Sequence, residues 1–354
     1  MRKFILATTS CATSLCAQDA STSNYPSSAR LSAQHGAQMT FSADWLYWKT
    51  SETGLSYVMK QEGFNPNFPE FMGFGNLIDP KFAWRSGFRA GLGYNIPSDQ
   101  WLLNTTWTWY EGKAESKTHA SGGDILFPTL IHPNVFNDEN IFSCNDSHAD
   151  LLLHVNIIDL NLGRPCQLGK KVTFHPYIGL RNAWLYQTYD IDYDDLFYYN
   201  TNDFALEPAL DNYFIRMIND FWGFGPRSGC DMDFKLGGDV SLFGGFTLSL
   251  LYGTFQISHA EHFQTHTDEG VMLSEKSHFH AGRFITDLRL GTRWSRSFHK
   301  ERFRILLEAS WEHHLFFSQN QMIRFVDGQN FGTFVQNQGD LYLQGWQLGF
   351  TFYF

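Results

Sequence analysis

Five histidines lie close together late in the chain, and imidazoles at such spacings can bind a metal ion. His259, His262 and His266 stand three and four residues apart, and His278 and His280 follow them. Zinc sites usually combine histidines with cysteines or carboxylates on a fixed scaffold. No cysteine lies among the five. We therefore interpret this stretch as a solvated loop, and we predict neither a metal site nor another cofactor.

Two short triplets could support a different chemistry, in which carboxylates and an imidazole activate water for hydrolysis. Asp192 and Asp194 form the first triplet, and Asp146 and His148 form the second. Such triplets are also common by chance, and the chain shows no nucleophile turn of the G-x-S-x-G kind. We therefore expect that the protein is not an enzyme.

The composition narrows the class of protein. Of 354 residues, 43% are hydrophobic, 17% are aromatic and 18% are charged, and the net charge is −10. This apolar and aromatic content excludes a disordered chain. The acidic balance argues against nucleic acid as a partner. No run of about 18 apolar residues occurs, which excludes transmembrane helices.

The N-terminal sequence predicts export. Residues 1–17 carry Arg2 and Lys3 ahead of a short apolar stretch and then small residues, which is typical of a secretory signal peptide. Residues 18–38 are rich in Ser, Ala, Gln and Thr without periodicity, so we predict a flexible leader. Residues 39–354 would then form the folded part.

The elements that must position the polar residues are β-strands, because hydrophobicity from residue 41 onward alternates with a period of two. Trp84 and Phe88, for example, share one face, while Arg85 and Arg89 share the other. The pattern predicts ten strands, over residues 41–48, 82–94, 101–111, 150–163, 172–188, 228–240, 246–255, 283–294, 302–315 and 339–354.

The connections between these strands alternate strictly in length. Short links such as residues 95–100 and 241–245 follow every second strand, and links of roughly twenty to forty residues follow the others. Outer-membrane barrels have short periplasmic turns and long extracellular loops. We therefore predict an all-β fold, a transmembrane antiparallel up-and-down β-barrel of about 10 strands. A further hairpin hidden in the long loops would make about 12.

The apolar face of each strand would meet lipid, so the charged face would line the lumen. Asp44 and Asp159 share the inward parity. Thirteen further residues are predicted to line the pore: Arg85, Arg89, Arg181, Asp231, Asp233, Lys235, Asp239, Asp287, Arg289, Arg293, Arg304, Glu308 and Glu312. Because the two signs nearly balance, charges should pair across strands.

The hairpin that joins residues 283–294 to residues 302–315 carries a register prediction. A turn centred between Phe298 and His299 would place Arg289 opposite Glu308. We expect this pair to form a constriction in a lumen of weak overall ion selectivity.

Cysteine pairing depends on the same topology. Cys144 and Cys230 fall at the external ends of predicted strands, whereas Cys166 falls in a periplasmic turn. A disulfide needs Cα atoms within about 7 Å, and the hydrocarbon core is about 30 Å thick, so Cys166 cannot reach the other two. The sequence allows a disulfide between Cys144 and Cys230, and equally three unpaired thiols.

Several segments resemble one family in their order and spacing. FSADWLYW, GFRAGLGY, IIDLNLGR, PYIGLRNAW, GFGP, LLYG and GDLYLQGWQLGFTFYF are similar to segments of the Legionella-type major outer membrane proteins, a pore-forming family also found among relatives of the chlamydiae. The resemblance implies a β-barrel porin in a bacterial outer membrane. The last apolar face resembles the signal read by the barrel-assembly machinery: Trp346, Leu348, Phe350, Phe352 and Phe354.

We therefore expect passive diffusion of ions and small hydrophilic solutes through the lumen. Outer-membrane lipid and the barrel-assembly machinery are the expected partners. The sequence leaves open whether the protein forms a homo-oligomer. About ten strands leave a narrow passage or none, so a non-conducting structural or adhesin-type barrel is the alternative. A protease of the omptin type, which uses an Asp pair and an Asp–His pair at its external rim, is less favoured because the surrounding sequence differs.

Overall fold

The computed structural model describes residues 38–63, 75–96, 101–133, 142–200, 205–298, 303–327 and 332–354. The predicted signal peptide and residues 18–37 lie outside this range. None of the described residues belongs to a helix long and apolar enough to cross a membrane.

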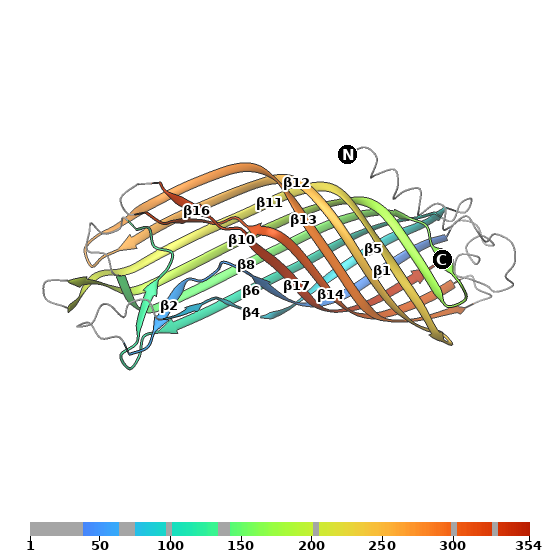
Figure 1. The fold of residues 1–354 in the computed structure, drawn as a ribbon, viewed down its shortest axis with the longest axis horizontal. Coiled ribbons are helices and arrows are strands. Elements are labelled where there is room, and N and C mark those ends of the chain that lie inside the picture. Colours follow the sequence, from blue (N-terminus) through green and yellow to red (C-terminus); the bar gives the residue numbers. More distant parts are fainter. Residues whose placement is uncertain are drawn as a thin grey trace.

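Long antiparallel strands close into a barrel, as predicted. In the described chain the ring has ten strands: β1 (Gln38–Glu52), β5 (Trp84–Ile96), β6 (Trp101–His119), β8 (Phe142–Gly163), β10 (Val172–Asn200), β11 (Ala205–Gly237), β12 (Val240–Gln264), β13 (Glu269–Phe298), β14 (Phe303–Asn320) and β17 (Gly339–Tyr353). Pairing of β6 with β8 and of β17 with β1 completes the ring. The strands wind obliquely around the long axis (Figure 1).

The barrel has two different ends, which we name the turn end and the loop end. At the turn end, Gly238 and Asp239 join β11 to β12, and the short strand β9 (Cys166–Leu168) precedes β10. The C-terminus also lies there (Figure 1). The loop half of the barrel holds six further short strands: β2 (Val58–Gln61), β3 (Asn76–Ile78), β4 (Lys81–Phe82), β7 (Ile125–Pro128), β15 (Ile323–Phe325) and β16 (Phe334–Gln336).

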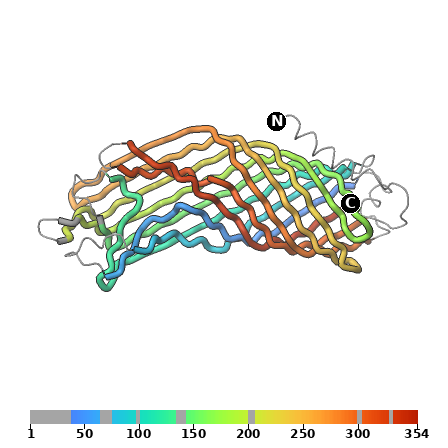
Figure 2. The backbone as a smooth tube through the Cα atoms, viewed as in Figure 1, coloured from blue at the N-terminus to red at the C-terminus, as the bar shows by residue number. Residues whose placement is uncertain are grey.

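Strands β10 to β13 are longer than the sequence predicted, with 29, 33, 25 and 30 residues. Figure 2 shows them running nearly the full length of the molecule. Residues 189–227 and 256–282, predicted as loops, are therefore mostly strand. The alternation predicts a strand only where the apolar side chains face outward. In the loop half the apolar side chains face inward and the polar ones outward.

The outer face of the turn half is apolar. Ile178 is 66% exposed there, and Trp184 is paired in register with Trp222 where β10 and β11 leave the apolar band. Tyr47 and Trp84 stack at a similar position on β1 and β5, with their ring centroids 5.3 Å apart. Exposed apolar side chains arranged in this way fit a band of lipid bordered by aromatic residues. The last strand contributes Trp346, Leu348, Phe350, Phe352 and, just beyond it, Phe354 to this outer surface.

The interior of the loop half is filled. Side chains from the connecting segments enter the barrel and are buried against its wall; we name them the mouth seal and define it as Leu55, Tyr57, Leu126, Leu130, Met322 and Ile323. Tyr189 of β10 donates a hydrogen bond to the carbonyl oxygen of Leu55 at 2.6 Å. Tyr193 donates to the carbonyl oxygen of Tyr57 at 2.5 Å. The seal is thus tied to the wall by hydrogen bonds as well as by packing.

The predicted register of the last long hairpin is wrong. Glu308 is paired with Arg293, and Arg289 is paired with Glu312. Strand β14 begins at Phe303 opposite Phe298, so the turn is centred two residues later than predicted. A change of four residues in the pairing keeps the parity of every side chain. The inward assignments therefore survive the error, although the partners do not.

The disulfide that the sequence allows between Cys144 and Cys230 does not form, because both are free cysteines. Cys144 is paired with Leu196 near the loop end, whereas Cys230 is paired with Pro176 near the turn end. The twenty residues between Pro176 and Leu196 on β10 span roughly 65 Å of extended strand. Cys230 was assigned to the loop side because most of β11 had been interpreted as loop.

Candidate functional site

The alternation along each strand carries charged side chains into the lumen of the turn half. On β10, Ile178 and Leu180 point outward, and Arg181 between these exposed positions and Trp184 is 3% exposed. The same period places Asp159 on β8 and Asp287 on β13 inside the barrel, where both are buried. The lipid-facing requirement for apolar residues thus fixes which charges share the interior.

The first part of the site is a cluster of two guanidinium groups and two carboxylates. Arg181 binds Asp159 through two hydrogen bonds of 2.7 and 3.0 Å. Its Nη2 lies 2.9 Å from Asp287 Oδ2. Arg227 of β11 forms an ion pair with Asp159 and reaches Asp287 at 3.8 Å. Each arginine therefore joins the same two acids, which lie on different strands.

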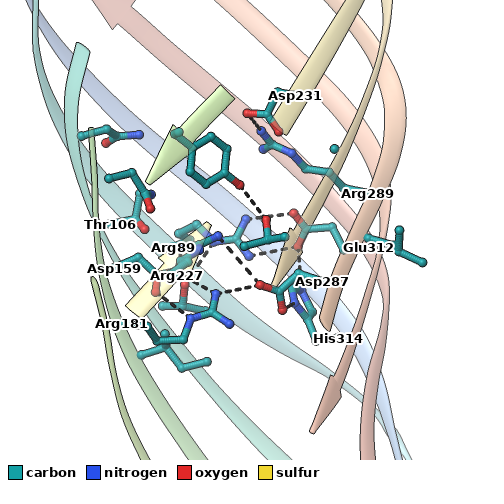
Figure 3. A pocket seen from close by; sticks show the side chains of 18 of the residues that line it. Arg89, Thr106, Asp159, Arg181, Arg227, Asp231, Asp287, Arg289, Glu312 and His314 are labelled. Atoms are coloured by element: carbon teal, nitrogen blue, oxygen red, sulfur yellow. Dashed lines mark hydrogen bonds and ion pairs between the residues drawn. The ribbon is translucent and has the colours of Figure 1, made fainter. Parts of the chain in front are cut away.

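The network continues through a histidine to the opposite wall. His314 Nδ1 lies 2.8 Å from Asp287 Oδ1, and its Nε2 lies 3.4 Å from Glu312 Oε2. Arg89 binds Glu312 through two hydrogen bonds of 2.9 and 3.0 Å. It also lies 3.5 Å from Asp44. The chain of contacts from Asp159 to Asp44 therefore touches seven of the ten barrel strands. Figure 3 shows its members other than Asp44 converging across the lumen.

A second group of ion pairs lies nearer the turn end. Arg289 Nη2 is 2.7 Å from Asp231 Oδ2. Arg293 Nη1 is 2.5 Å from Asp233 Oδ1, and Arg293 also forms an ion pair with Glu308. These contacts replace the predicted pairing of Arg289 with Glu308.

A small cavity lies within these charges. Its volume is about 140 Å³, and Thr106, Asn161, His175 and Tyr177 line it together with the ion pairs. This space accommodates several water molecules. Toward the loop end Trp48 and Leu343 border it, and both are buried. The polar space therefore ends at the apolar interior of the loop half.

The two groups contain more acid than base. Five arginines (Arg89, Arg181, Arg227, Arg289 and Arg293) face seven carboxylates (Asp44, Asp159, Asp231, Asp233, Asp287, Glu308 and Glu312). The excess is two negative charges before His314 is counted. Because both ring nitrogens of His314 face carboxylate oxygens, the geometry favours its doubly protonated form. This part of the lumen is thus weakly anionic.

Four of the predicted pore-lining residues lie outside both groups. Arg85 is exposed and is paired in register with Trp48. Lys235 and Asp239 are exposed at the turn end. Arg304 lies over the ring of Tyr353, with its guanidinium carbon 5.4 Å from the ring centroid. Arg85, Lys235 and Asp239 therefore face solvent, and Arg304 packs on a ring; none of the four forms an ion pair across the lumen with another residue that the structure describes.

Sequence reasoning missed two members of the network. Arg227 falls in a segment that was interpreted as loop, so no parity was assigned to it. His314 follows Glu308 and Glu312 at the inward parity of β14, and this parity was the signal that could have found it. A histidine escapes a parity count that is limited to residues charged at neutral pH.

The residues of the hydrolase alternative come together, but on the outer wall of the loop half. Asp192 is paired with His148, and Asp194 is paired with Asp146. Tyr193, between the two aspartates, points inward and is buried. Since neighbouring residues of a strand point to opposite faces, the two aspartates face outward. Burial and the neighbouring carboxylate of Asp194 raise the pKa of Asp192.

A possible ligand set for a metal lies beside them. Glu115, His148 and Asp150 offer ligand atoms within 4.8 Å of one another. His148 Nε2 lies 2.8 Å from Asp150, and Lys113 forms ion pairs with Glu115 at 3.5 Å and with Asp150 at 3.7 Å. The lysine thus supplies the positive charge that the two carboxylates attract.

The histidine-rich stretch is not a solvated loop, because four of its five histidines lie on β12 or β13. His262, His278 and His280 are exposed on the outer face. His266, in the short link between the two strands, forms a pair with Asp211. His259 is buried inside the barrel. The extension of both strands beyond the apolar band accounts for the difference.

Comparison with known proteins gives one family and several distant structures. A family model described as the Legionella pneumophila major outer membrane protein precursor matches residues 33–354. No curated protein matches the chain.

Among solved structures, the outer membrane protease OmpT from Escherichia coli has a TM-score of 0.41 and 10% identity, over 90% of this chain and 96% of that one. A major outer membrane protein from Thermus thermophilus has a TM-score of 0.31 and 11% identity, over 90% and 100%. The Pseudomonas putida toluene transporter TodX has a TM-score of 0.26 and 9% identity, over 92% and 91%. None of these similarities transfers an activity or a ligand to this chain.

Proposed function

The chain belongs to the family of the Legionella pneumophila major outer membrane protein, and we propose that it is a porin whose lumen is closed by the mouth seal. Small ions would pass along the charged lumen of the turn half when the mouth seal opens. The bacterial outer membrane is its location, as the family indicates.

The observation that carries the proposal is the ion-pair network across the lumen. Burying charges is unfavourable, and a barrel with a purely structural role could be filled by apolar side chains instead. Arg89 contacts both Asp44 and Glu312, and Arg227 contacts both Asp159 and Asp287. Such shared contacts allow an arginine to exchange partners while an ion passes, so that no charge loses all its partners.

A non-conducting structural barrel is the second candidate, and one observation favours it. The loop half holds a continuous apolar core that includes Tyr57, Tyr189 and Phe255, each fully buried. An apolar interior of this kind blocks hydrated ions. The two candidates therefore differ only in whether the mouth seal moves.

Planar-bilayer recording separates the two candidates. A porin gives rare, discrete current steps in wild type, and the excess of carboxylates gives a weak preference for cations. Asp44→Asn should move the reversal potential toward anions, because it removes a negative charge beside Arg89. Asp190→Asn is the matched control, since Asp190 binds Arg216 on the outer wall. Complete silence across many insertions would support the structural barrel instead.

We also propose two partners for the barrel and a class of transported species. Outer-membrane lipid would cover the apolar band, and the barrel-assembly machinery would read the exposed aromatic face of β17. Ions and small hydrophilic solutes would be the transported species.

A further inference from the structure

A buried pair of titratable side chains lies inside the loop half, outside the lumen network. His259 is 1% exposed and Glu261 is 0% exposed. Both project inward from β12, two residues apart. Buried ionisable groups are unfavourable unless other groups satisfy them. Their partners therefore indicate what the pair holds in place.

Each partner comes from a different part of the mouth. His259 Nδ1 lies 2.9 Å from the carbonyl oxygen of Ile323, in β15. Its Nε2 lies 2.7 Å from Glu261 Oε1. The other carboxylate oxygen, Oε2, accepts a hydrogen bond of 3.0 Å from the backbone N–H of His132 and another from the hydroxyl of Tyr213. The pair thus connects two mouth segments to β11 and β12.

Aromatic contacts strengthen this connection. The ring of Phe325, also in β15, lies 4.8 Å from the ring of His132 and 5.6 Å from the ring of His259, measured between centroids. Ile323 belongs to the mouth seal, and His132 follows Leu130 of the seal by two residues. Releasing the pair would therefore free both sides of the seal at once.

Proton counting shows that only one protonation state satisfies every contact. One proton between His259 Nε2 and Glu261 Oε1 serves the contact whichever atom carries it, and a second proton on Nδ1 is donated to Ile323. An added proton would either place two donors against each other between Nε2 and Oε1, or, on Oε2, turn the Tyr213 hydroxyl into an acceptor and leave its own hydrogen without the carboxylate partner. A removed proton would leave a ring nitrogen facing an oxygen with no hydrogen between them.

The surrounding titratable groups leave this balance intact. Burial, and then the carboxylate of Glu261, raise the pKa of Tyr213, so its phenol keeps the proton that it donates. Burial lowers the pKa of His132, whose contact with the pair is through its backbone. Tyr193 of β10 is buried and binds Tyr57. Glu275 of β13 is paired in register with His259 and is exposed.

We propose that His259 and Glu261 form a proton-sensitive latch that holds the mouth seal closed near neutral pH and releases it when the pair gains a proton. The proposal rests on the porin function for its consequence, since release of the seal would open the lumen. The latch itself is a property of the loop half and can be tested without current.

Hydrogen–deuterium exchange of the purified full-length protein in detergent provides that test. At about pH 7, peptides covering residues 321–326 and 129–133 should be protected in wild type. Glu261→Met keeps the length of the side chain but removes both carboxylate oxygens, so that His259 Nε2, the backbone N–H of His132 and the hydroxyl of Tyr213 lose their partner. It should raise exchange in both segments by roughly tenfold or more, a change of about 1.4 kcal/mol in the opening equilibrium. Wild type in mild acid should show the same rise after correction for intrinsic exchange.

His266→Gln is the matched control, because it removes another histidine–carboxylate contact, that with exposed Asp211, and should leave both segments protected. Should Glu261→Met fail to fold, Tyr213→Phe removes one donor to the carboxylate, and the seal of that variant should be released at a higher pH than the seal of wild type. Unchanged exchange in the folded variants and in acid would overturn the latch.

Current recorded from the same samples keeps the two proposals apart. Raised exchange in Glu261→Met without any current in any sample supports the latch and contradicts the porin. Current steps in wild type with unchanged exchange in Glu261→Met support the porin and contradict the latch.

Discussion

The turn half and the loop half of the barrel are built from the same strands with opposite polarity. On β10, Leu180 is exposed and Arg181 is buried in the turn half, whereas Asp190 points outward and Tyr189 is buried in the loop half. The period of two never changes, because it is a property of the strand. What changes is the solvent outside, from lipid to water, and the interior changes with it.

The two halves are stabilised by different interactions. In the turn half, charges from seven strands neutralise one another across the lumen. In the loop half, apolar packing such as that of Phe221 on Phe255, with ring centroids 4.6 Å apart, fills the interior. Substitutions that exchange the two kinds of interior should therefore be the most damaging.

The largest effect should follow from removing a central charge in the turn half. Arg181→Ala leaves Asp159 and Asp287 with less positive charge in a buried site, and it should lower the free energy of unfolding by about 3–5 kcal/mol. Arg216→Ala is the matched control, because Arg216 also binds an aspartate through two hydrogen bonds of 2.8 Å, but on the exposed outer wall. It should lose less than about 1 kcal/mol. Urea titration of the barrel in detergent measures both, and equal losses would contradict the contrast between interior and exterior.

A smaller effect concerns a carboxyl group inside the loop half. Glu52 accepts a hydrogen bond of 2.6 Å from Gln187, and burial raises the pKa of Glu52 from 4.5 to about 8. Below about pH 4.5 the Glu52 carboxyl is protonated in both the folded and the unfolded chain, so it does not lower the free energy of unfolding. As pH rises from 4.5 to about 8, this carboxyl ionises in the unfolded chain before it ionises in the folded chain. The free energy of unfolding therefore falls across that window.

Glu52→Gln should therefore stabilise the protein increasingly from about pH 5 to pH 8, by a few kcal/mol at the upper limit. The variant and wild type should agree near pH 4. Thermal unfolding at several pH values gives this comparison. A constant difference at all pH values would show that Glu52 does not titrate in the folded barrel as its burial requires.

A coupling of intermediate to small size should link Arg293 and Glu308. Because the two are paired in register and form an ion pair, the losses in the free energy of unfolding caused by Arg293→Gln and by Glu308→Gln should not add. The loss in the double variant should be smaller than the sum of the two single losses by about 1–3 kcal/mol. The pair Arg289→Gln and Glu308→Gln is the comparison and should couple more weakly, because Glu308 forms its ion pair with Arg293 whereas Arg289 forms its ion pair with Asp231. Stronger coupling of Arg289 with Glu308 would contradict this register.

The smallest effect on stability is expected at the C-terminus. Phe354 is 49% exposed, and its ring stacks on that of Phe352 with the centroids 5.8 Å apart. Deleting Phe354 should lower the amount of barrel assembled in the outer membrane, while purified barrel unfolds as wild type does. Quantitative blotting of outer-membrane fractions measures assembly, and unchanged levels would argue against the assembly signal.

The fold could be predicted from the sequence because lipid imposes a simple rule on the outer face. The parity of Arg89, Asp287 and Glu312 follows from apolar neighbours on the strands, without any knowledge of partners. The partners themselves depend on strand register, which the turn around residues 299–302 determines and which parity cannot detect. A shift of four residues changed the partner of Glu308 and left its direction unchanged.

The loop half was harder to predict because its pattern is inverted. Residues such as Tyr213 and Ile215 are buried and alternate with polar residues, so the segment looks like an irregular loop to a search for lipid-facing strands. The position of Cys230 and the role of Arg227 were lost with that segment. Contacts between distant segments, such as Tyr189 with Leu55, leave no periodic signal in the sequence.

Single-channel conductance of Tyr57→Ala tests the central claim, that the mouth seal closes an otherwise charged lumen. Tyr57 is fully buried in the seal, and its carbonyl oxygen and hydroxyl are bound by Tyr193 and Thr118. Leu77→Ala is the control, because Leu77 lies in the same mouth region and is 62% exposed. We expect frequent current steps for Tyr57→Ala and wild-type behaviour for Leu77→Ala. A Tyr57→Ala barrel that folds but conducts no more than wild type would contradict it.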